Sequence, residues 1–215
     1  MTTVTAEPAN KATERARRAY DRAAHWYDLQ EWLPERLAFH KWRRQLWNLI
    51  PGGLVLEVGV GTGKNLRYYR QGQSVTAIDF SPKMLERARR NAQHGGVKAT
   101  LQLMDVQALE FPDSSFDSAM STFVFCSVPD PVRGLGEVRR VLRPGGRVYL
   151  LEHVLSRRQP ARWLMQRLNG IMRTFDGANL NRDTVANVEL AGFDLVDIRD
   201  LWGDIVKLIV AERAV

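Results

Sequence analysis

Short apolar runs rich in valine and leucine alternate along this chain with longer stretches in which apolar residues recur at three- and four-residue steps. The clearest runs occupy 54–58 and 74–78, and each is bounded by glycine or polar residues. Such runs are typical of strands buried on both faces of a parallel sheet, whereas the three- and four-residue spacing is typical of helices. The alternation predicts an α/β fold with a doubly wound, mostly parallel sheet.

The positions of the expected elements follow from the same alternation. Strands are predicted at 54–58, 74–78, 99–103, 116–122, 147–153, 193–200 and 206–212. Helices are predicted after a glycine turn that follows the first strand, and at about 82–92, 131–142 and 181–191. Ser81 and Pro82 supply an N-cap and a first-turn proline for the helix at 82–92. The Pro-Gly-Gly segment at 144–146 is expected to form a turn before the fifth strand.

The first 50 residues have a different character. Helical patterns cover about 11–29 and 31–49, and Pro34 is expected to break or kink the second pattern near its start. The Pro-Gly-Gly segment at 51–53 then ends the helical pattern. We therefore predict a helical extension or lid at 1–50 and one further domain at 51–215.

Length and composition limit the class of protein. With 215 residues, of which 45% are hydrophobic, the chain is long enough for one substantial core and short for two full domains. It has no run of about 18 apolar residues, and its first residues lack the apolar stretch of a secretory signal, so we expect a cytoplasmic protein. Cys126 is the single cysteine, which excludes an internal disulfide and a Cys-x-x-Cys zinc pair. We expect no bound metal and a buried, inert thiol.

The formal net charge of +7 favours an anionic partner, either nucleic acid or a membrane surface, while a solvated helix face is the default interpretation of each basic cluster. Nucleic acid is the less favoured partner, because the sequence has neither a basic appendage with interleaved aromatic residues nor an Asn/Asp-Pro-Pro-aromatic block. No obligate protein partner is evident. An amphipathic helix among arginines at 157–175 could lie on an anionic membrane, or could be an ordinary lid packed on the sheet; its apolar positions are Leu164, Leu168, Ile171 and Phe175.

A glycine-rich turn follows the first predicted strand. Residues 57–63 read Glu-Val-Gly-Val-Gly-Thr-Gly, so that Gly59, Gly61 and Gly63 remove side chains where backbone amides can approach a ligand. The spacing is G-x-G-x-G after an acid, and not the G-x-G-x-x-G that accommodates a dinucleotide pyrophosphate. The turn therefore disfavours NAD as the ligand.

Acidic residues follow the next two predicted strands. Asp79 lies twenty positions after Gly59, where a carboxylate can accept hydrogen bonds from both hydroxyls of a ribose, and Phe80 can cover an adenine face. Asp105 offers an acceptor for the adenine amino group, and Val106 offers an apolar wall. The alternatives are that Asp79 is a helix N-cap and that Glu57 is a solvated acid at the end of a strand. Because ligands bind parallel sheets beyond the carboxyl ends of the strands, we favour a nucleoside site.

In these motifs the sequence resembles the class I S-adenosylmethionine-dependent methyltransferases, over roughly residues 15–213. Phe-Asp at 116–117 and Leu-Arg-Pro-Gly-Gly at 142–146 are similar to the family's block after its fourth strand. The resemblance implies a sheet of order 3-2-1-4-5-7-6 with an antiparallel seventh strand, S-adenosylmethionine as cofactor with S-adenosylhomocysteine as product, and Glu57 and Gly59 near the methionine portion. The cofactor contacts predicted in this way are Tyr20, Tyr27, Glu57, Gly59, Gly61, Thr62, Gly63, Asn65, Asp79, Phe80, Met84, Asp105, Val106 and Thr122.

Methyl transfer is an in-line displacement at a sulfonium methyl group, so much of the catalysis comes from positioning the nucleophile. His153 ends the fifth predicted strand and is the best single candidate for a general base, with a structural, hydrogen-bonded histidine as the alternative. Tyr20 and Tyr27 lie seven residues apart on one predicted helix face and could close the site near the sulfonium, with Tyr27 as a second catalytic candidate. The alternative for this pair is plain core packing.

Finer resemblances indicate a hydrophobic acceptor. The segment 20–28 resembles the opening of quinone C-methyltransferases and bacterial phospholipid N-methyltransferases. Segments 125–128, 152–154 and 175–180 are similar to membrane-associated alkyl-thiol methyltransferases and to bacterial phosphatidylethanolamine enzymes. Residues 123–128 lack the Gly-Leu-Arg-Asn block typical of quinone enzymes, which counts against quinone C-methylation. We expect a phosphatidylethanolamine-type amine first and thiols or quinols second; nucleic-acid methylation and a non-catalytic cofactor-binding scaffold are the other classes.

Overall fold

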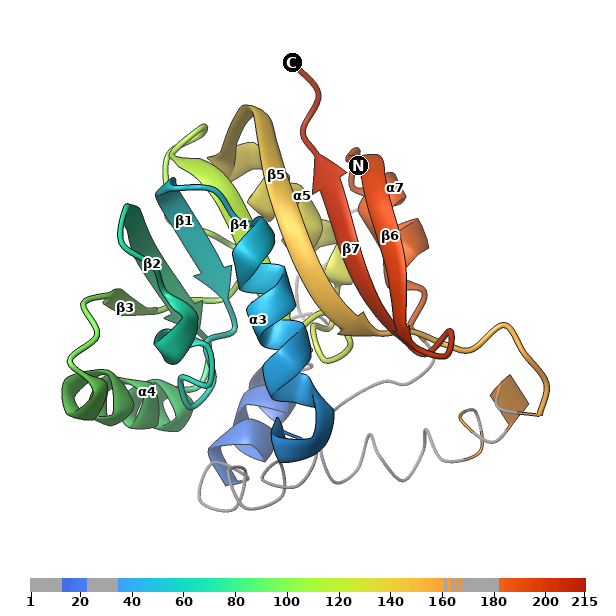
Figure 1. Cartoon of the computed structure of the whole chain (residues 1–215), viewed down its shortest axis with the longest axis horizontal. Helices are drawn as coiled ribbons and strands as arrows, with labels where there is room; N and C mark the ends of the chain where they lie inside the picture. Colours follow the sequence, from blue (N-terminus) through green and yellow to red (C-terminus); the bar gives the residue numbers. More distant parts are fainter. Residues whose placement is uncertain (1–12, 23–34, 161, 164, 166, 168–181) are drawn as a thin grey trace, which may run out of the picture.

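A computed structural model describes residues 13–22, 35–160, 162, 163, 165, 167 and 182–215. In this part of the chain the centre is a seven-stranded sheet of order β3-β2-β1-β4-β5-β7-β6, in which β7 is antiparallel to both of its neighbours and the other pairs are parallel (Figure 1). The predicted order and the antiparallel seventh strand are confirmed. The strands are β1 (Gly53–Val58), β2 (Gln73–Asp79), β3 (Thr100–Leu103), β4 (Phe116–Thr122), β5 (Leu142–His153), β6 (Asp194–Trp202) and β7 (Val206–Glu212).

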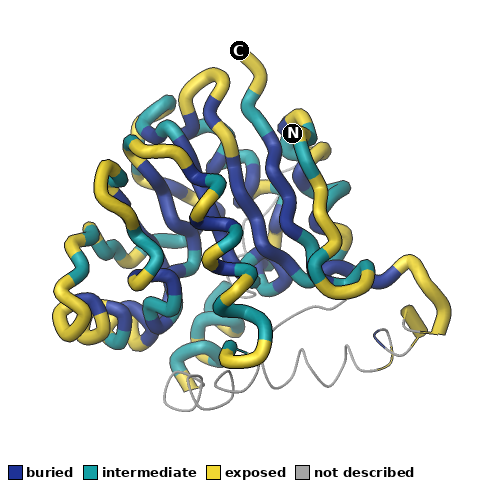
Figure 2. Tube along the Cα trace, in the orientation of Figure 1, coloured by how far each residue is buried: buried dark blue, intermediate teal, exposed yellow. Residues whose placement is uncertain are grey.

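Helices cover both faces of the sheet. α3 (His40–Leu49) and α4 (Pro82–Gly95) pack on one face, and α5 (Pro131–Val141) and α7 (Thr184–Leu190) pack on the other (Figure 1). A π-helical turn, η1 (Glu35–Phe39), leads into α3. The central strands are buried while the outer sides of the helices are exposed (Figure 2). Within the described ranges, no helix has the length and apolar character needed to cross a membrane.

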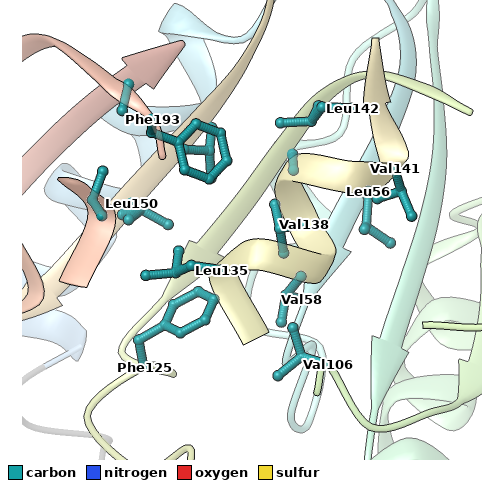
Figure 3. Packing of buried hydrophobic residues seen from close by; sticks show 14 of the residues in the cluster. Leu56, Val58, Val106, Phe125, Leu135, Val138, Val141, Leu142, Leu150 and Phe193 are labelled. Carbon is teal, nitrogen blue, oxygen red and sulfur yellow. The ribbon is translucent and has the colours of Figure 1, made fainter. Parts of the chain in front are cut away.

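Two apolar clusters hold the helices on the sheet. Leu135 and Val138, three residues apart on α5, lie in one cluster with Leu56 of β1 and Leu150 of β5, and all four side chains are fully buried (Figure 3). On the other face Trp47 of α3 belongs to a second cluster with residues of β1, β2, β5 and β7. Each helix therefore buries the apolar stripe that its sequence spacing predicted.

The connection after β1 differs from the predicted helix. Only a short 3-10 turn, η2 (Leu66–Tyr68), follows the glycine loop before β2 begins at Gln73. The glycine loop and the turn that continues it occupy 59–65, which leaves seven residues before β2, too few to repay the cost of starting an α-helix. The face of the sheet beside η2 is covered by α3, since the rings of Trp47 and Tyr69 lie 4.8 Å apart.

The predicted turn at 144–146 is also wrong, because this segment lies within β5. The strand begins at Leu142, and a register shift opposite Asp117 shows that the segment forms a bulge. A Cβ on Gly146 would lie 2.8 Å from the carbonyl oxygen of Arg143, so only glycine fits this bulge. The other predicted strands, and the helices at 82–92, 131–142 and 181–191, agree with the structure to within about three residues at each described end.

The described parts of the N-terminal region are helical, as predicted. They comprise residues 13–22, η1 and α3, whereas Pro34 and Tyr27 lie outside the described residues. Leu46 of α3 is fully buried in the core on one face of the sheet. The predicted domain boundary at residue 50 stays a proposal. Although α3 precedes this boundary, its buried side chains belong to the core formed with the sheet at 51–215.

Replacing Leu135 with alanine should lower the free energy of unfolding by about 2–5 kcal/mol, because it leaves a cavity between α5 and the sheet. Leu190 is the matched control: its side chain on α7 is 73% exposed, and Leu190→Ala should change stability by less than about 0.5 kcal/mol. Urea denaturation followed by circular dichroism measures both. Equal losses for the two variants would contradict the packing of α5.

Candidate active site

A cavity opens at the edge of the sheet where β1, β2 and β4 end. Its volume is about 670 Å³, including the space at its mouth. Nine of the predicted cofactor contacts line it, namely Tyr20, Gly59, Gly61, Asp79, Phe80, Met84, Asp105, Val106 and Thr122. The sequence interpretation did not assign a binding role to other lining residues, which include Met104, Gln107, Phe123, Val124, Ser127, Val128 and Pro129.

The glycine loop after β1 has two positions that require glycine for different reasons. Gly59 has φ +68°, and a Cβ there would lie 2.5 Å from Cγ2 of Val124, so the loop and the segment after β4 are in close contact. Gly61 has φ +56° with open space around its Cα, and its backbone N–H donates to Oδ2 of Asp79 at 2.8 Å. The loop is thereby fixed to the end of β2 and leaves room beside Gly61 for a ligand.

Asp79 is held in one orientation by two backbone hydrogen bonds. Oδ2 accepts from Gly61, and Oδ1 accepts from the N–H of Ser81 at 2.8 Å. Burial raises the pKa of Asp79 to about 6, although these hydrogen bonds to its charged form oppose the shift. Ser81, and not Asp79, caps α4, because its Oγ accepts from the N–H of Met84 at 3.2 Å. The carboxylate of Asp79 therefore lines the cavity without serving as the helix cap.

Gln107 organises the other side of the cavity. Its Nε2 donates to Oδ2 of Asp105 at 3.0 Å and to Oγ1 of Thr13 at 3.0 Å. Its Oε1 accepts from the N–H of Asp130, the N-cap of α5, at 2.9 Å. One amide side chain thus connects the loop after β3, the start of α5 and the helix at 13–22.

The helix at 13–22 lies against the mouth of the cavity. Tyr20 lines the cavity and meets the ring of Phe80 edge to face at 5.7 Å. Asp21 accepts a hydrogen bond from Oγ of Ser81 at 2.6 Å. Contact between Tyr20 and a cofactor stays a prediction, and Tyr27 falls outside the described residues.

Four predicted cofactor contacts do not line the cavity: Glu57, Thr62, Gly63 and Asn65. Glu57 is fully buried and accepts hydrogen bonds from Nδ2 of Asn65 at 2.7 Å and from the hydroxyl of Tyr69. Burial raises the pKa of Glu57, and the hydrogen bonds from Tyr69 and Asn65 oppose that shift. Glu57 is therefore not the solvated acid of the alternative interpretation, and direct contact between these four residues and a cofactor stays a prediction.

Arg43 of α3 is a buried cation whose role the sequence interpretation missed. Its guanidinium pairs with Glu35 (Nε to Oε2, 3.1 Å) and donates to Oδ1 of Asn65 at 3.2 Å and to Oγ1 of Thr122. It also lies 5.7 Å from the ring centre of Phe123. The sequence carries a signal for this position, because Arg43 falls on the buried stripe of α3, three residues before Leu46. Arg43 links α3 to Asn65, which follows the glycine loop, and to the end of β4.

His153 lies beside the cavity and does not line it. Its ring stacks on Phe123 with centres 4.5 Å apart and meets Phe39 edge to face at 6.2 Å. Burial lowers the pKa of His153 to about 4, so its imidazole is neutral at physiological pH. Cys126 is buried, as the sequence predicted, and its Sγ lies 3.6 Å from the carbonyl oxygen of Phe123. The end of β5 thus presents an aromatic, uncharged surface next to the cavity.

Glu152, the neighbour of His153, is a second buried group to which the sequence interpretation assigned no role of its own. It is fully buried, and burial raises its pKa to about 7 against the hydrogen bonds that it accepts from the segment after β4. The signal was an acid inside the apolar strand Leu150-Leu151-Glu152. Among the described residues, no group of three histidine, cysteine or acidic side chains is placed to hold a metal ion.

Wild-type affinity for S-adenosylmethionine should fall as the pH drops below about 6. The raised pKa of Asp79 means that its charged form is present above about pH 6 and is lost below it, and a protonated carboxyl group cannot accept two hydrogen bonds from a ribose diol. Asp79→Asn should weaken binding by about tenfold or more at pH 8. Calorimetric titration measures both, with the exposed Asp113→Asn as control. Constant wild-type affinity from pH 8 to pH 5 would contradict this role.

Known proteins to which this chain is similar in sequence include several methyltransferases. The family model described as a methyltransferase domain matches residues 56–150. A phosphatidylethanolamine N-methyltransferase from Cereibacter sphaeroides is 43% identical over 111 residues, which are 51% of this chain and 55% of that protein. A thiol S-methyltransferase from Homo sapiens is 34% identical over 152 residues (68% and 62%), and a demethylmenaquinone methyltransferase from Thermus thermophilus is 37% identical over 132 residues (59% and 60%). The matches span more than half but less than two thirds of each relative's length.

Solved structures share the fold. An S-adenosylmethionine-dependent methyltransferase from Thermotoga maritima, described as a possible histamine N-methyltransferase, aligns with a TM-score of 0.68 at 22% identity and covers 91% of this chain and 99% of that one. At this identity the likeness concerns the fold alone. The sequence matches, with which the fold, the glycine loop and the position of Asp79 agree, show that the chain belongs to the class I S-adenosylmethionine-dependent methyltransferases. This family implies S-adenosylmethionine as the cofactor.

Proposed function

We propose that this chain transfers a methyl group from S-adenosylmethionine to a lipophilic acceptor, with a phosphatidylethanolamine-type amine as the first candidate. The observation that carries the proposal is one cavity with two kinds of wall. The glycine loop, Asp79 and Asp105 suit a nucleoside, while Phe123 presents an aromatic ring backed by His153 and Phe39. The 43% identical relative named as a phosphatidylethanolamine N-methyltransferase supports this order of candidates.

In the proposed reaction, the lone pair of a neutral amine attacks the methyl carbon as the carbon–sulfur bond breaks. S-adenosylhomocysteine leaves, and the methylated nitrogen later loses a proton. Catalysis in such a displacement depends on alignment, which rigid walls provide. Asp79 would hold the ribose and Asp105 the adenine, so that the sulfonium is aimed toward the aromatic side. We further propose that Tyr20 and Tyr27 close the site over the cofactor.

The neutral state of His153 fits an acceptor that needs little help from a base. With a pKa of about 4, its imidazole is free of a proton at physiological pH but binds one weakly. His153 can therefore accept a hydrogen bond from an amine or a thiol, but it is too weak a base to hold the proton that methyl transfer releases. We keep His153 as the proposed base on these terms.

The second candidate is a lipophilic thiol. Arg43 places a buried guanidinium 5.7 Å from the ring of Phe123, and a cation at this position would stabilise a thiolate. The charge of Arg43 is partly offset by its ion pair with Glu35, which keeps this candidate second. Quinol C-methylation comes third, because residues 123–128 lack the block typical of quinone enzymes.

We also propose peripheral contact with an anionic membrane. Arg158, Arg162 and Trp163 are exposed, and the guanidinium of Arg167 lies 5.0 Å from the ring centre of Trp163. Exposed arginines beside an exposed tryptophan suit the headgroup region of a bilayer. The apolar positions that the sequence predicted for this helix, Leu164, Leu168, Ile171 and Phe175, lie outside the described residues.

Methyl transfer is tested with S-adenosylmethionine carrying a labelled methyl group, offered in parallel to phosphatidylethanolamine vesicles, an alkyl thiol, a quinol and total RNA. We expect label in phosphatidylethanolamine, and about a tenfold or greater loss with Asp79→Asn at subsaturating cofactor. Asp113→Asn is the control for the loss of one carboxylate. Label in RNA alone would overturn the lipophilic acceptor, and label in the thiol alone would reverse the order of candidates.

A pair of substitutions separates the two roles of His153. If it is the base, His153→Ala and His153→Phe should both lower kcat by about a hundredfold or more, because both lack the imidazole nitrogens. If its ring only packs against Phe123, His153→Phe should retain nearly full kcat while His153→Ala loses activity. Steady-state kinetics with the acceptor that is labelled best distinguishes these results.

A further inference from the structure

Glu152 reaches from the end of β5 into the turn after β4. Its Oε1 accepts hydrogen bonds from the backbone N–H of Val124 at 3.0 Å, from the N–H of Phe125 at 3.1 Å and from Oγ of Ser121 at 3.2 Å. Its Oε2 is also buried and has no hydrogen-bond partner among the residues that the structure describes. Burying a carboxylate away from water lowers the stability of the fold, so a residue of this kind indicates a structural or functional role.

The turn that Glu152 holds contains a strained residue. Phe123 has φ +58°, in the left-handed region, which is a strained conformation for a residue with a Cβ. Its own N–H donates to the carbonyl oxygen of Leu151 at 2.8 Å, and the next two N–H groups both point to Oε1 of Glu152. These hydrogen bonds favour the turn in spite of the strain, because without them the partly buried N–H of Val124 and the buried N–H of Phe125 would lose their partner.

The turn at 123–125 positions two residues that line the cavity. The ring of Phe123 stacks on His153 and lies 4.7 Å from the ring of Phe39. The side chain of Val124 packs against Gly59 so closely that no Cβ fits there. Phe123 and Val124 both line the cavity. A change in the turn would therefore move the Phe123 ring on the acceptor side of the cavity, while the glycine loop stays fixed to the end of β2 by the hydrogen bond from Gly61 to Asp79.

We propose that Glu152 is a positioning residue for methyl transfer, which fixes the turn at 123–125 and thereby sets the place of the Phe123 ring beside the acceptor. This inference rests on the proposed function, since the acceptor side is defined by it. Glu152 acts through Oε1 as a hydrogen-bond acceptor and touches no reacting atom. A neutral amide oxygen can make the same hydrogen bonds, so the role does not require a negative charge.

The hydrogen bonds are tested in the full-length chain by amide hydrogen exchange at Val124 and Phe125. Glu152→Ala should lower the protection of both amides by about tenfold or more, whereas Glu152→Gln should keep it within about threefold. Glu212→Ala, which removes a carboxylate that pairs with Arg147 at the surface, is the matched control. If Glu152→Ala does not fold, Glu152→Asp replaces it, because its shorter side chain cannot reach both amides. Unchanged protection in the folded variant would overturn the proposal.

The positioning role is tested by kinetics with labelled S-adenosylmethionine and phosphatidylethanolamine vesicles, or with whichever acceptor the parallel assay labels. Glu152→Ala should lower kcat/KM for the acceptor by about tenfold, while the calorimetric Kd for S-adenosylmethionine stays within about threefold. Glu152→Gln should restore kcat/KM to within about threefold of wild type. A role in folding alone would lower the unfolding temperature and leave kcat/KM per folded molecule unchanged, which would overturn the proposal.

A double-mutant cycle shows whether Glu152 acts through Phe123. The double variant Glu152→Ala with Phe123→Ala should have about the same kcat/KM as Phe123→Ala alone, because the ring that Glu152 places is already absent. Losses that multiply would overturn the proposed route. If the wild-type chain methylates no acceptor, the proposed function is wrong, and hydrogen exchange still decides whether Glu152 holds the turn.

Discussion

The parallel pairing of β1 with β2 on one side and β4 on the other is the constraint on which the site depends. In this register Val58 of β1 lies beside Ile78 of β2 and Ser121 of β4, so the three strands end together. The glycine loop and Asp79 then meet at hydrogen-bond distance. A slip of one residue would turn every side chain of the strand to the opposite face and separate these groups. The apolar clusters on both faces make such a slip costly, and the core thereby sets the geometry of the site.

Buried charged and titratable groups gather at this edge of an otherwise apolar sheet. Arg43, Glu57, Asp79 and Glu152 are all buried there, and each is held by hydrogen bonds to a neighbouring element. The pKa values of the three acids are raised by the same cause, loss of hydration. Burying such groups costs stability, and their hydrogen bonds recover part of that cost only in one arrangement. The result is a rigid framework, in which Asp79 faces the cavity and the other three fix the loops around it.

Much of the framework could be predicted from local patterns. The apolar runs placed all seven strands, and the glycines with Asp79 located the cavity, because these signals depend on residues close together in sequence. Two predictions were wrong, in both cases because the same local sequence pattern is compatible with more than one secondary structure. The glycine turn was expected to lead into an α-helix but leads into η2, and the segment at 144–146 was expected to precede β5 but lies inside it as a bulge. The connection after the glycine turn is too short for an α-helix, and the segment at 144–146 is held in the sheet because the backbone of Gly145 and Gly146 is hydrogen-bonded to that of Arg213.

By itself, the sequence determined the order of the elements, the edge of the sheet where the cavity lies and the kind of cofactor. Apolar periodicity and turn residues act over a few neighbouring positions, and they can be read along the chain. Only the tertiary structure decided that Arg43 meets Thr122, that Gln107 meets Thr13, and that Glu152 holds the turn at Phe123. A hydrogen bond forms only when donor and acceptor come within about 3 Å, and for groups far apart in sequence that distance is set by the packing of the whole sheet and its helices.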